Sequence, residues 1–377
     1  MPPSAPLRLD PGIAAKARLT ALSLIDLGAI RENYGVLSVA SGSAECAAIV
    51  KGDGYGLGML PVAGAAWAAG ARLFFVAHFE DAVALRAAFP EARIAALDGL
   101  GGHLPADFED ARVMPVLGSP ADVQAWFASS RVTPVMLHID TAMNRLGLKP
   151  RELAGLAAAL RASKNPIGAY LTHFASADDG NRALCRLQVE RFHAALKGLP
   201  AAPHSITNSS GLYLDVAWSG DITRPGKALY GINPAQPGDP MPVTQALTVL
   251  APILQISDVR PGDTIGYSAT FRAERPMRIA TLGIGYANGY LRALSNKGIA
   301  AFAGVRAPLV GRVSMDLVTV DVTTVPAAAL KDGYAEMLGR TVGLTELSTL
   351  AGSNEYELQI ALGRGCHRIY TGATAQT

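Results

Sequence analysis

The chain has 377 residues, half of them hydrophobic, and its 33 lysines and arginines nearly balance 31 acidic residues, for a formal net charge of +2. This length allows one large domain with a second, smaller one. The balanced charge gives no reason to expect a nucleic-acid or membrane-surface partner. No apolar run approaches the roughly 18 residues that a membrane-spanning helix needs.

The N-terminal residues 1–19 contain scattered charged side chains and no uninterrupted apolar region. They do not resemble a secretory signal, and we expect a poorly ordered or loosely packed extension. The three cysteines, Cys46, Cys185 and Cys366, lie far apart and form neither a metal-binding spacing nor a disulfide framework. Together these features indicate a cytoplasmic protein without a metal site.

From residue 46 onward, short apolar runs alternate with runs rich in alanine and leucine. The apolar runs predict strands, and the runs between them predict helices, for example at 151–162 and 182–197. Eight such repeats favour parallel strands joined by crossover helices, and eight is the strand count of a TIM-like (β/α)8 barrel. An open, doubly wound sheet is the alternative, because the span is short for a barrel. The predicted strands are 46–51, 72–78, 93–98, 112–117, 133–140, 166–173, 204–208 and 221–224.

After about residue 240 the pattern changes to short strands separated by turns. The segment 233–242 is rich in proline and glycine and is interpreted as a linker. Beyond it, we predict a mostly-β domain with one helix near 345–351. The predicted strands of this domain are 246–258, 277–284, 308–313 and 316–322. The predicted domains are an N-terminal extension at 1–19, a barrel at 20–240 and a C-terminal β domain at 241–377.

Candidate reactive residues stand where the predicted barrel strands end, which is where TIM barrels form their active sites. Lys51 ends the first strand, within "IVKGDGYGLG", and His173 ends the sixth. Segments rich in hydroxyls and glycine, "TNSSG" and "RPGK", follow the seventh and eighth strands. Barrels of this kind bind phosphate there. A lysine with a phosphate site suggests pyridoxal 5′-phosphate, held by Lys51 as a Schiff base.

Seven segments, in order, resemble the signature segments of alanine racemases, and the resemblance covers roughly residues 20–372. It implies an α/β barrel followed by a β domain, in a head-to-tail homodimer whose active sites each use both chains. It also implies interconversion of L-alanine and D-alanine, which supplies D-alanine for peptidoglycan or catabolises it. The segments are "IVKGDGYGLG", "HIDTAMNRLG", "THFASAD", "TNSSG", "RPGKALYG", "GYSATFRAERPMRIATLGIGYANGY" and "GRVSMDLVTVDVT".

The resemblance implies roles for individual residues. Lys51 would carry the cofactor and act as the base on one face of the substrate. Tyr267, supplied by the other chain, would be the base on the opposite face. Arg224 would lie against the pyridine nitrogen of the cofactor, and His173 would lie near its ring. The cofactor phosphate would be held by Tyr55, Ser209, Gly226 and Tyr370, with Asn208 as a support beside Ser209.

The substrate carboxylate would be bound by Arg145, with Met315 and Asp316 of the other chain lining the same pocket. Lysine and tyrosine ordinarily titrate near 10, too high for good bases at neutral pH. Burial lowers the pKa of a lysine, and nearby cations such as Arg145 and Arg224 lower the pKa of both bases. An arginine at the pyridine nitrogen can only donate a hydrogen bond, so it would keep that nitrogen unprotonated and disfavour side reactions.

Three positions depart from the family pattern. Many relatives carry a carbamylated lysine at the position of His138, so Arg145 must here be held otherwise, by an anion or by Asn144. The usual cysteine before "MD" is Ser314. The common "KADAYG" is "KGDGYG" in this chain, and we expect the two glycines to make the lysine loop more mobile.

Three other functions remain as alternatives. A pyridoxal-phosphate-dependent decarboxylase of the same barrel architecture would need a long glycine-rich phosphate segment and a cysteine-containing acidic motif, and the sequence shows neither. A non-catalytic cofactor-binding barrel would usually lack the second domain. A racemase for another small amino acid, such as serine, would differ only in the pocket.

Overall fold

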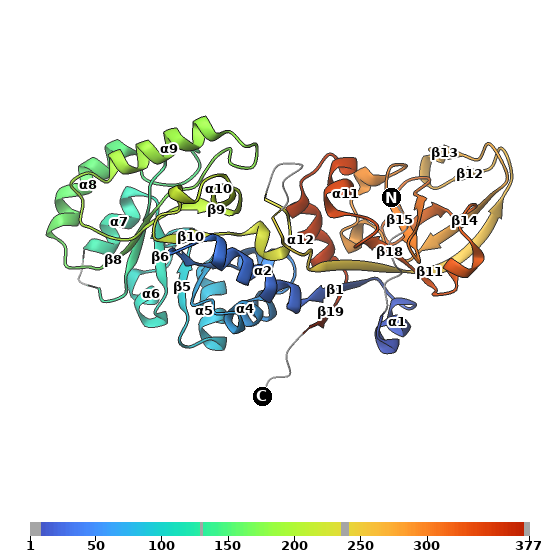
Figure 1. Cartoon of the computed structure of the whole chain (residues 1–377), viewed down its shortest axis with the longest axis horizontal. Helices are drawn as coiled ribbons and strands as arrows, with labels where there is room; N and C mark the ends of the chain where they lie inside the picture. The colour runs from blue at the N-terminus through green and yellow to red at the C-terminus, as the bar shows by residue number, and fades with distance from the viewer. Residues whose placement is uncertain (1–8, 129–130, 235–240, 373–377) are drawn as a thin grey trace. The chain divides into compact units, whose positions relative to one another are not determined.

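A computed structural model of the protein describes residues 9–128, 131–234 and 241–372, and the chain divides into two compact units (Figure 1). We call them the barrel unit and the β unit. The barrel unit comprises Ala29–Gly54 and Gly58–Thr244, and the β unit comprises the described residues of Met1–Gly28, Tyr55–Leu57 and Gln245–Thr377.

Parallel strands close into a barrel in the barrel unit. The first strand consists of two short pieces, β2 (Glu45–Cys46) and β3 (Ala48–Ile49). The piece β2 pairs with the last strand and β3 pairs with the second, so the sheet closes on itself across Ala47. This closure confirms the predicted TIM-like barrel and excludes the open sheet. The other strands follow in chain order: β4 (Leu73–Val76), β5 (Arg93–Ala96), β6 (Met114–Leu117), β7 (Val135–His138), β8 (Ile167–Leu171), β9 (His204–Asn208) and β10 (Ile222–Arg224).

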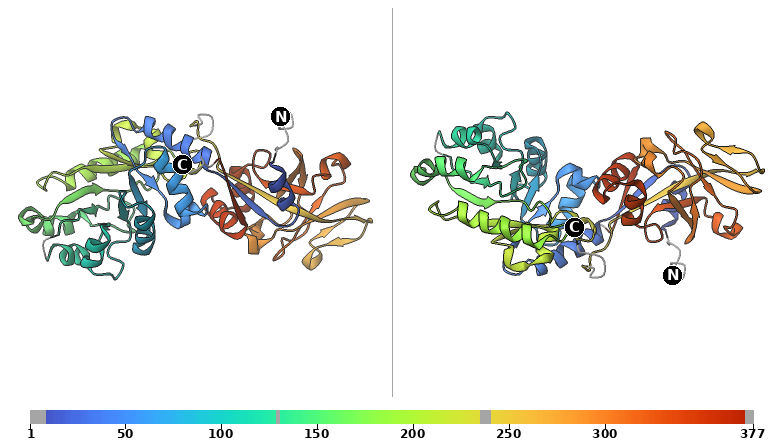
Figure 2. Two further views of the ribbon diagram at one scale, coloured as in Figure 1. Left: turned by 90° about the horizontal axis from the view of Figure 1, so that it is seen from below. Right: turned by 90° about the horizontal axis from the view of Figure 1, so that it is seen from above.

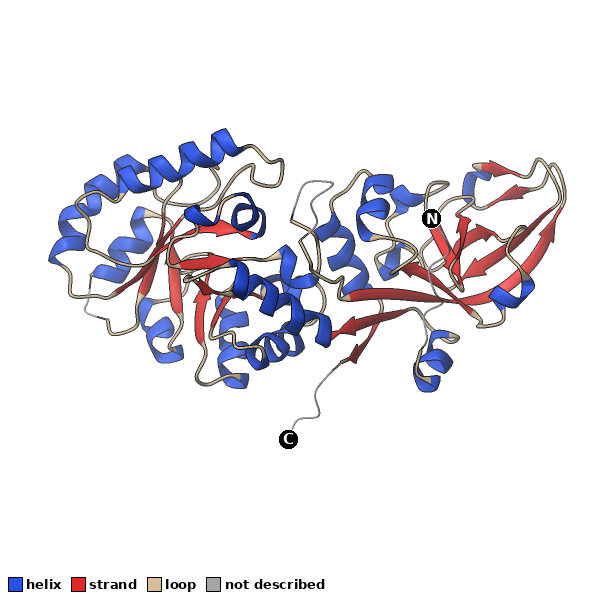
Figure 3. Cartoon of the chain, in the orientation of Figure 1, coloured by secondary structure: helices blue, strands red, loops and turns tan. Residues whose placement is uncertain are grey.

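The helices of the barrel unit flank its strands, as Figure 2 shows from two further sides and Figure 3 shows by colour. Strands covered in this way are buried on both faces, which is why they read as continuous apolar runs rather than as alternating ones. The helix α8 (Pro150–Ala162) shows the complementary pattern, since it buries Leu153, Leu156 and Leu160 at helical spacing. The others are α2 (Leu27–Ala40), α4 (Met59–Ala68), α5 (Phe79–Ala88), α6 (Pro105–Ala111), α7 (Pro120–Phe127), α9 (Arg182–Ala195) and α10 (Ser209–Leu214).

The β unit contains a mostly antiparallel sheet that follows the order β16-β15-β18-β11-β1-β19, in which β14 also pairs with β11 and β17 pairs with β14. Two helices, α11 (Leu344–Ala351) and α12 (Glu355–Gly365), pack against each other beside it (Figure 1). The strands of the sheet are β1 (Leu22–Asp26), β11 (Leu247–Val259), β14 (Met277–Leu282), β15 (Ile299–Phe302), β16 (Val305–Pro308), β17 (Val318–Asp321), β18 (Tyr334–Leu338) and β19 (His367–Thr371).

The beginning of the chain differs from the prediction. Strand β1 pairs with β11 and β19, so residues 20–28 group with the β unit rather than with the barrel predicted at 20–240. Residues 9–19 are not a loose extension either. They contain α1 (Pro11–Ala17), whose last residue, Ala17, is fully buried against Leu22 and Leu250.

Two further predictions about the second half of the chain have different outcomes. The single predicted helix is present as α11, but α12 was missed because charged residues and a glycine interrupt its apolar pattern. The predicted linker at 233–242 falls largely on residues 235–240, which lie outside the described residues.

Candidate active site

Lys51 stands directly after the first barrel strand and begins α3 (Lys51–Tyr55), where the backbone turns in the left-handed direction. The Gly54 amide donates to the Val50 carbonyl at 2.9 Å, which closes this turn. Left-handed geometry costs non-glycine residues roughly 1–2 kcal/mol each, so the three glycines of "KGDGYG" avoid this cost at three of the five left-handed positions. Five successive residues have positive φ: Gly52 (65°), Asp53 (59°), Gly54 (60°), Tyr55 (50°) and Gly56 (85°).

Arg224 is a buried cation at the end of β10, with 5% of its surface exposed. Its guanidinium donates to the Ser205 hydroxyl and to the Thr172 carbonyl. The Ser205 hydroxyl in turn donates to the Ile222 carbonyl at 2.7 Å. Burial lowers the pKa of Arg224 to about 10, so the group remains charged at neutral pH. These contacts fix a donor-only cation at the end of β10, against Thr172, which follows β8, and Ser205, the second residue of β9.

The electrostatics of the barrel end favour a neutral lysine. Burial lowers the pKa of Lys51, and the charges of Arg145 and Arg224 lower it further. Burial is the main cause that lowers the pKa of His173 to about 3 and that of His138 to about 4, and the charge of Arg224 is the next largest cause. Both imidazoles are therefore neutral at physiological pH, and the cationic surroundings increase the fraction of Lys51 that is an unprotonated nucleophile.

Arg145 lies in the loop between β7 and α8. The Leu148 amide donates to the His138 carbonyl at 2.8 Å, and the Asp140 amide donates to the Leu148 carbonyl at 2.9 Å. Gly147, with φ of 110°, makes this closure possible, since a Cβ there would lie 2.8 Å from the Asp140 nitrogen. The Arg145 side chain itself is exposed and donates no hydrogen bond to any described residue. The loop backbone therefore determines where Arg145 is presented.

The predicted phosphate segments adjoin each other after β9 and β10. Ser209 is buried, and its hydroxyl accepts a hydrogen bond from the Ala228 amide at 3.2 Å, next to the segment that contains Gly226. Asn208 caps α10 by accepting from the Gly211 amide at 2.9 Å. The neighbouring Ser210 hydroxyl is buried and has no hydrogen-bond partner among the described residues. Buried hydroxyls normally have a hydrogen-bond partner, so this one fits a site in which a bound polar group, such as a phosphate, supplies the partner.

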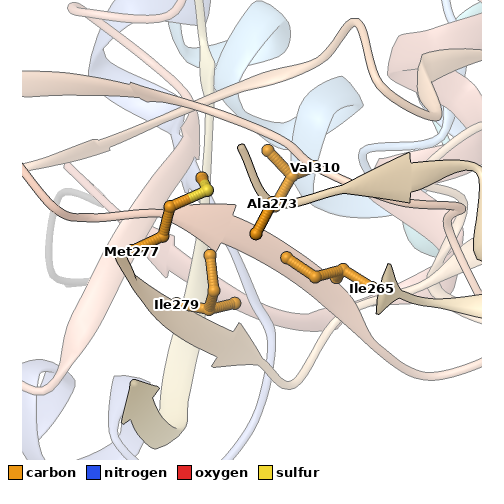
Figure 4. Close-up of a cluster of buried hydrophobic side chains, with 5 residues drawn as sticks. All are labelled: Ile265, Ala273, Met277, Ile279 and Val310. Atoms are coloured by element: carbon orange, nitrogen blue, oxygen red, sulfur yellow. The ribbon is translucent and has the colours of Figure 1, made fainter. Parts of the chain in front are cut away.

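Tyr267 lies at the tip of a hairpin in the β unit, formed by β12 (Thr264–Ile265) and β13 (Phe271–Arg272). The tyrosine side chain is 72% exposed. Gly266, with φ of 74°, lies so close to the neighbouring chain segment that a Cβ would be 3.1 Å from the Arg312 nitrogen. The base of the hairpin is anchored by a buried cluster, which is shown in Figure 4: Ile265, Ala273, Met277, Ile279 and Val310.

Met315 and Asp316 are exposed on a tight turn of the β unit. Both the amide and the hydroxyl of Ser314 donate to the Leu317 carbonyl, at 3.0 and 2.7 Å. The Met315 carbonyl accepts from the Ala287 amide at 2.9 Å. Ser314 therefore closes the turn that presents both side chains.

Tyr370 and Tyr55, the remaining predicted phosphate ligands, belong to the β unit. The Tyr370 hydroxyl donates to the Leu57 carbonyl at 3.1 Å. The Tyr55 carbonyl accepts from the Gln359 side chain at 3.3 Å, and its ring meets that of Tyr356 edge to face, with the ring centres 6.2 Å apart. These contacts hold the segment after the lysine turn against α12.

The structure thus gathers Lys51, His173 and Arg224 at one end of the barrel unit, with Arg145 near enough to lower the pKa values of Lys51 and His173. The sequence did not identify Ser205 and Thr172 as the partners of Arg224. The available signal was a hydroxyl residue within the apolar run of a buried strand.

The described part of the chain offers no group of three or more His, Cys, Asp or Glu side chains that could hold a metal ion. None of its described helices is long and apolar enough to cross a membrane.

Two family models match the chain: the N-terminal domain of alanine racemase over residues 25–234 and the C-terminal domain over 246–370. The alanine racemase of Methylobacterium sp. (strain 4-46) is 41% identical over 359 residues, which cover 94% of this chain and 97% of the relative. That of Rhizobium meliloti (strain 1021) is 38% identical over 377 residues, with coverage of 96% and 98%.

Solved structures give the same result. The alanine racemase of Bartonella henselae with covalently bound pyridoxal phosphate matches with a TM-score of 0.88 and 34% identity, over 93% of this chain and 99% of that one. The biosynthetic alanine racemase of Pseudomonas aeruginosa matches with a TM-score of 0.86 and 31% identity, over 93% and 99%. The fold and the family predicted from the sequence are confirmed. The chain belongs to the alanine racemase family of pyridoxal-phosphate-dependent isomerases.

Proposed function

We propose that the protein interconverts L-alanine and D-alanine and carries pyridoxal 5′-phosphate on Lys51. The observation that carries this proposal is the environment of Lys51, a partly buried amine at the barrel end whose pKa is lowered by burial and by two arginines. Such an amine is suited to covalent attachment and to proton transfer. The relatives named above are alanine racemases, and the one from Bartonella holds the cofactor covalently.

The described residues fit the cofactor. Arg224 offers a fixed guanidinium for the ring nitrogen, and neutral His173 lies in the same charge cluster. The phosphate would be held by Ser209, Gly226, Tyr55 and Tyr370, and the orphaned Ser210 hydroxyl supports a polar occupant there. Asn208 would act as a support through its cap of α10. When bound, pyridoxal phosphate withdraws electrons from the substrate and acidifies the proton on Cα.

Two bases on opposite faces then complete the proton transfer. Lys51 removes or returns the Cα proton on one face, and Tyr267 of a second copy does so on the other. Arg145 binds the substrate carboxylate, beside Met315 and Asp316 of the second copy. The exposure of Tyr267 and Met315, 72% and 55%, supports a homodimer with shared sites. We place the enzyme in the cytoplasm, where it provides D-alanine for peptidoglycan or catabolises it.

The test is chiral chromatography of L-alanine incubated in deuterium oxide with the purified, cofactor-loaded protein. We expect D-alanine that carries deuterium at Cα, because Cα is deprotonated and the returning proton comes from solvent. If L-alanine stays unchanged while the cofactor remains bound to Lys51, the assigned substrate is wrong.

A further inference from the structure

An ion pair lies within the loop that carries Arg145. The Lys149 ammonium donates to Asp140 Oδ2 at 2.5 Å and to Asn144 Oδ1 at 2.6 Å. The other carboxylate oxygen of Asp140 accepts from the amides of Ala142 and Asn144, at 3.0 and 3.2 Å. Lys149, at the end of the loop, is thus hydrogen-bonded both to Asp140 at the start of the loop and to Asn144, the residue immediately before Arg145.

We propose that Lys149, acting through Asp140 and Asn144, is a positioning residue that holds Arg145 in place for the substrate carboxylate. This inference rests on the proposed function, because it assigns a support to the group that would bind that carboxylate. It also identifies what holds Arg145 in a chain whose nearby β7 residue, His138, carries no negative charge.

Arg145 needs support from its loop because its guanidinium donates no hydrogen bond to the described residues. His138 cannot supply a negative partner, since its imidazole is neutral at physiological pH. The backbone before Arg145 is also unusual, as Asn144 has a left-handed φ of 55°. Asparagine can adopt the left-handed conformation but does not require it. Two hydrogen bonds select this conformation of the loop: Lys149 donates to the Asn144 side chain, and the Asn144 amide donates to Asp140.

The charge balance shows why Lys149 matters to this network. The Asp140 side chain is 2% exposed, whereas that of Lys149 is 36% exposed. Burial by itself raises the pKa of the Asp140 carboxyl, but the hydrogen bonds from Lys149, Asn144 and Ala142 outweigh burial and leave the pKa below its ordinary value. Without the ammonium, the buried Asp140 carboxylate would lose its cationic partner and the loop would rearrange to solvate it.

The experiment compares Lys149→Met, which removes the charge, with Lys149→Arg, which keeps it. Lys164→Met, at an exposed lysine after α8, is the matched control. Hydrogen–deuterium exchange followed by mass spectrometry should show faster exchange across residues 140–149 in Lys149→Met only. In the cofactor-loaded protein, the KM for alanine should rise about tenfold, because a displaced Arg145 loses part of its charged hydrogen bond to the substrate carboxylate, while kcat changes much less.

Propionate, which is alanine without its amino group, reports directly on the carboxylate site. Titration calorimetry should show propionate binding weakened by Lys149→Met and restored by Lys149→Arg. Asn144→Gly keeps the left-handed backbone but removes one acceptor, so it should weaken binding less and remains informative where Lys149→Met fails to fold. Equal exchange, KM and propionate affinity in Lys149→Met and the control would overturn the inference. A wild-type protein that binds propionate but does not racemise alanine would instead overturn the proposed function.

Discussion

The Arg224 guanidinium donates a hydrogen bond to the Ser205 hydroxyl, and that hydroxyl donates its own hydrogen bond to the Ile222 carbonyl. Both residues are buried. The serine therefore satisfies a charged donor and a backbone acceptor at once, on the strand next to the one that carries the arginine. A positioned cation at the barrel end thus depends on one small hydroxyl.

Ser205→Ala should lower the free energy of unfolding by about 1–3 kcal/mol, the cost of leaving a buried polar group without its partner. Urea denaturation of the two proteins measures this difference, with Ser43→Ala at an exposed serine as the control. We also expect weaker cofactor binding, because Arg224 is then held by Thr172 alone among the described residues. Wild-type stability in Ser205→Ala would show that water replaces the hydroxyl without penalty.

The two glycines after Lys51 allow a paired test of the left-handed turn. A Cβ at Gly52 would meet nothing within 4 Å, whereas a Cβ at Gly54 would lie 3.2 Å from the Met59 nitrogen. Gly52→Ala should therefore cost only the backbone strain, about 1 kcal/mol. Gly54→Ala should cost more, because the backbone at Met59 must also shift. Urea denaturation of both variants gives the comparison, and equal losses would contradict the contact argument.

His138 and His173 make the barrel unit sensitive to acid. Their pKa values, about 4 and about 3, lie below the ordinary 6.5, so the unfolded chain binds more protons than the folded one at mildly acidic pH. The stability that each provides is present above pH 6.5 and is lost as the pH falls toward its folded-state pKa. Between pH 8 and pH 5, each histidine should remove about 2 kcal/mol from the free energy of unfolding.

His138→Gln tests this dependence, since glutamine does not titrate. Between pH 8 and pH 5 the variant should lose about 2 kcal/mol less stability than the wild type. His193→Gln, at an exposed histidine, is the control and should follow the wild type. Parallel losses in His138→Gln and the wild type would show that His138 is not held neutral in the folded protein.

The barrel strands from β3 to β8 were predictable because they are apolar runs followed by polar residues, and Lys51 and His173 lie at two of those junctions. The position of strand β1 in the β unit was not predictable, because its partners β11 and β19 lie more than 200 residues further along the chain and no local sequence feature marks the pairing. The same holds for Ser205, whose role depends on which side chain the neighbouring strand places beside it. The family resemblance supplied the site residues, whereas the contacts of Lys149 and Ser205 can be recognised only in the three-dimensional structure.

Tyr267→Phe tests the assignment of the second base. A phenyl ring cannot exchange a proton, so racemisation should fall by about 10²–10⁴-fold. Lys51 would still remove and return a proton on its own face. In deuterium oxide, one enantiomer of alanine should therefore gain deuterium at Cα without inversion, while the other should remain unlabelled. Chiral chromatography with mass spectrometry separates these species.

Lys51→Ala is the matched control, because it removes the other proposed base and the proposed site of covalent cofactor attachment and should abolish exchange into both enantiomers. Exchange into both at similar rates in Tyr267→Phe would mean that another group protonates the second face. The hairpin geometry makes a folding artefact easy to recognise. Tyr267 is exposed at the tip, and its anchor, the cluster around Ile265 and Ile279, is untouched by the substitution. An exchange pattern confined to one enantiomer can therefore be attributed to the lost hydroxyl.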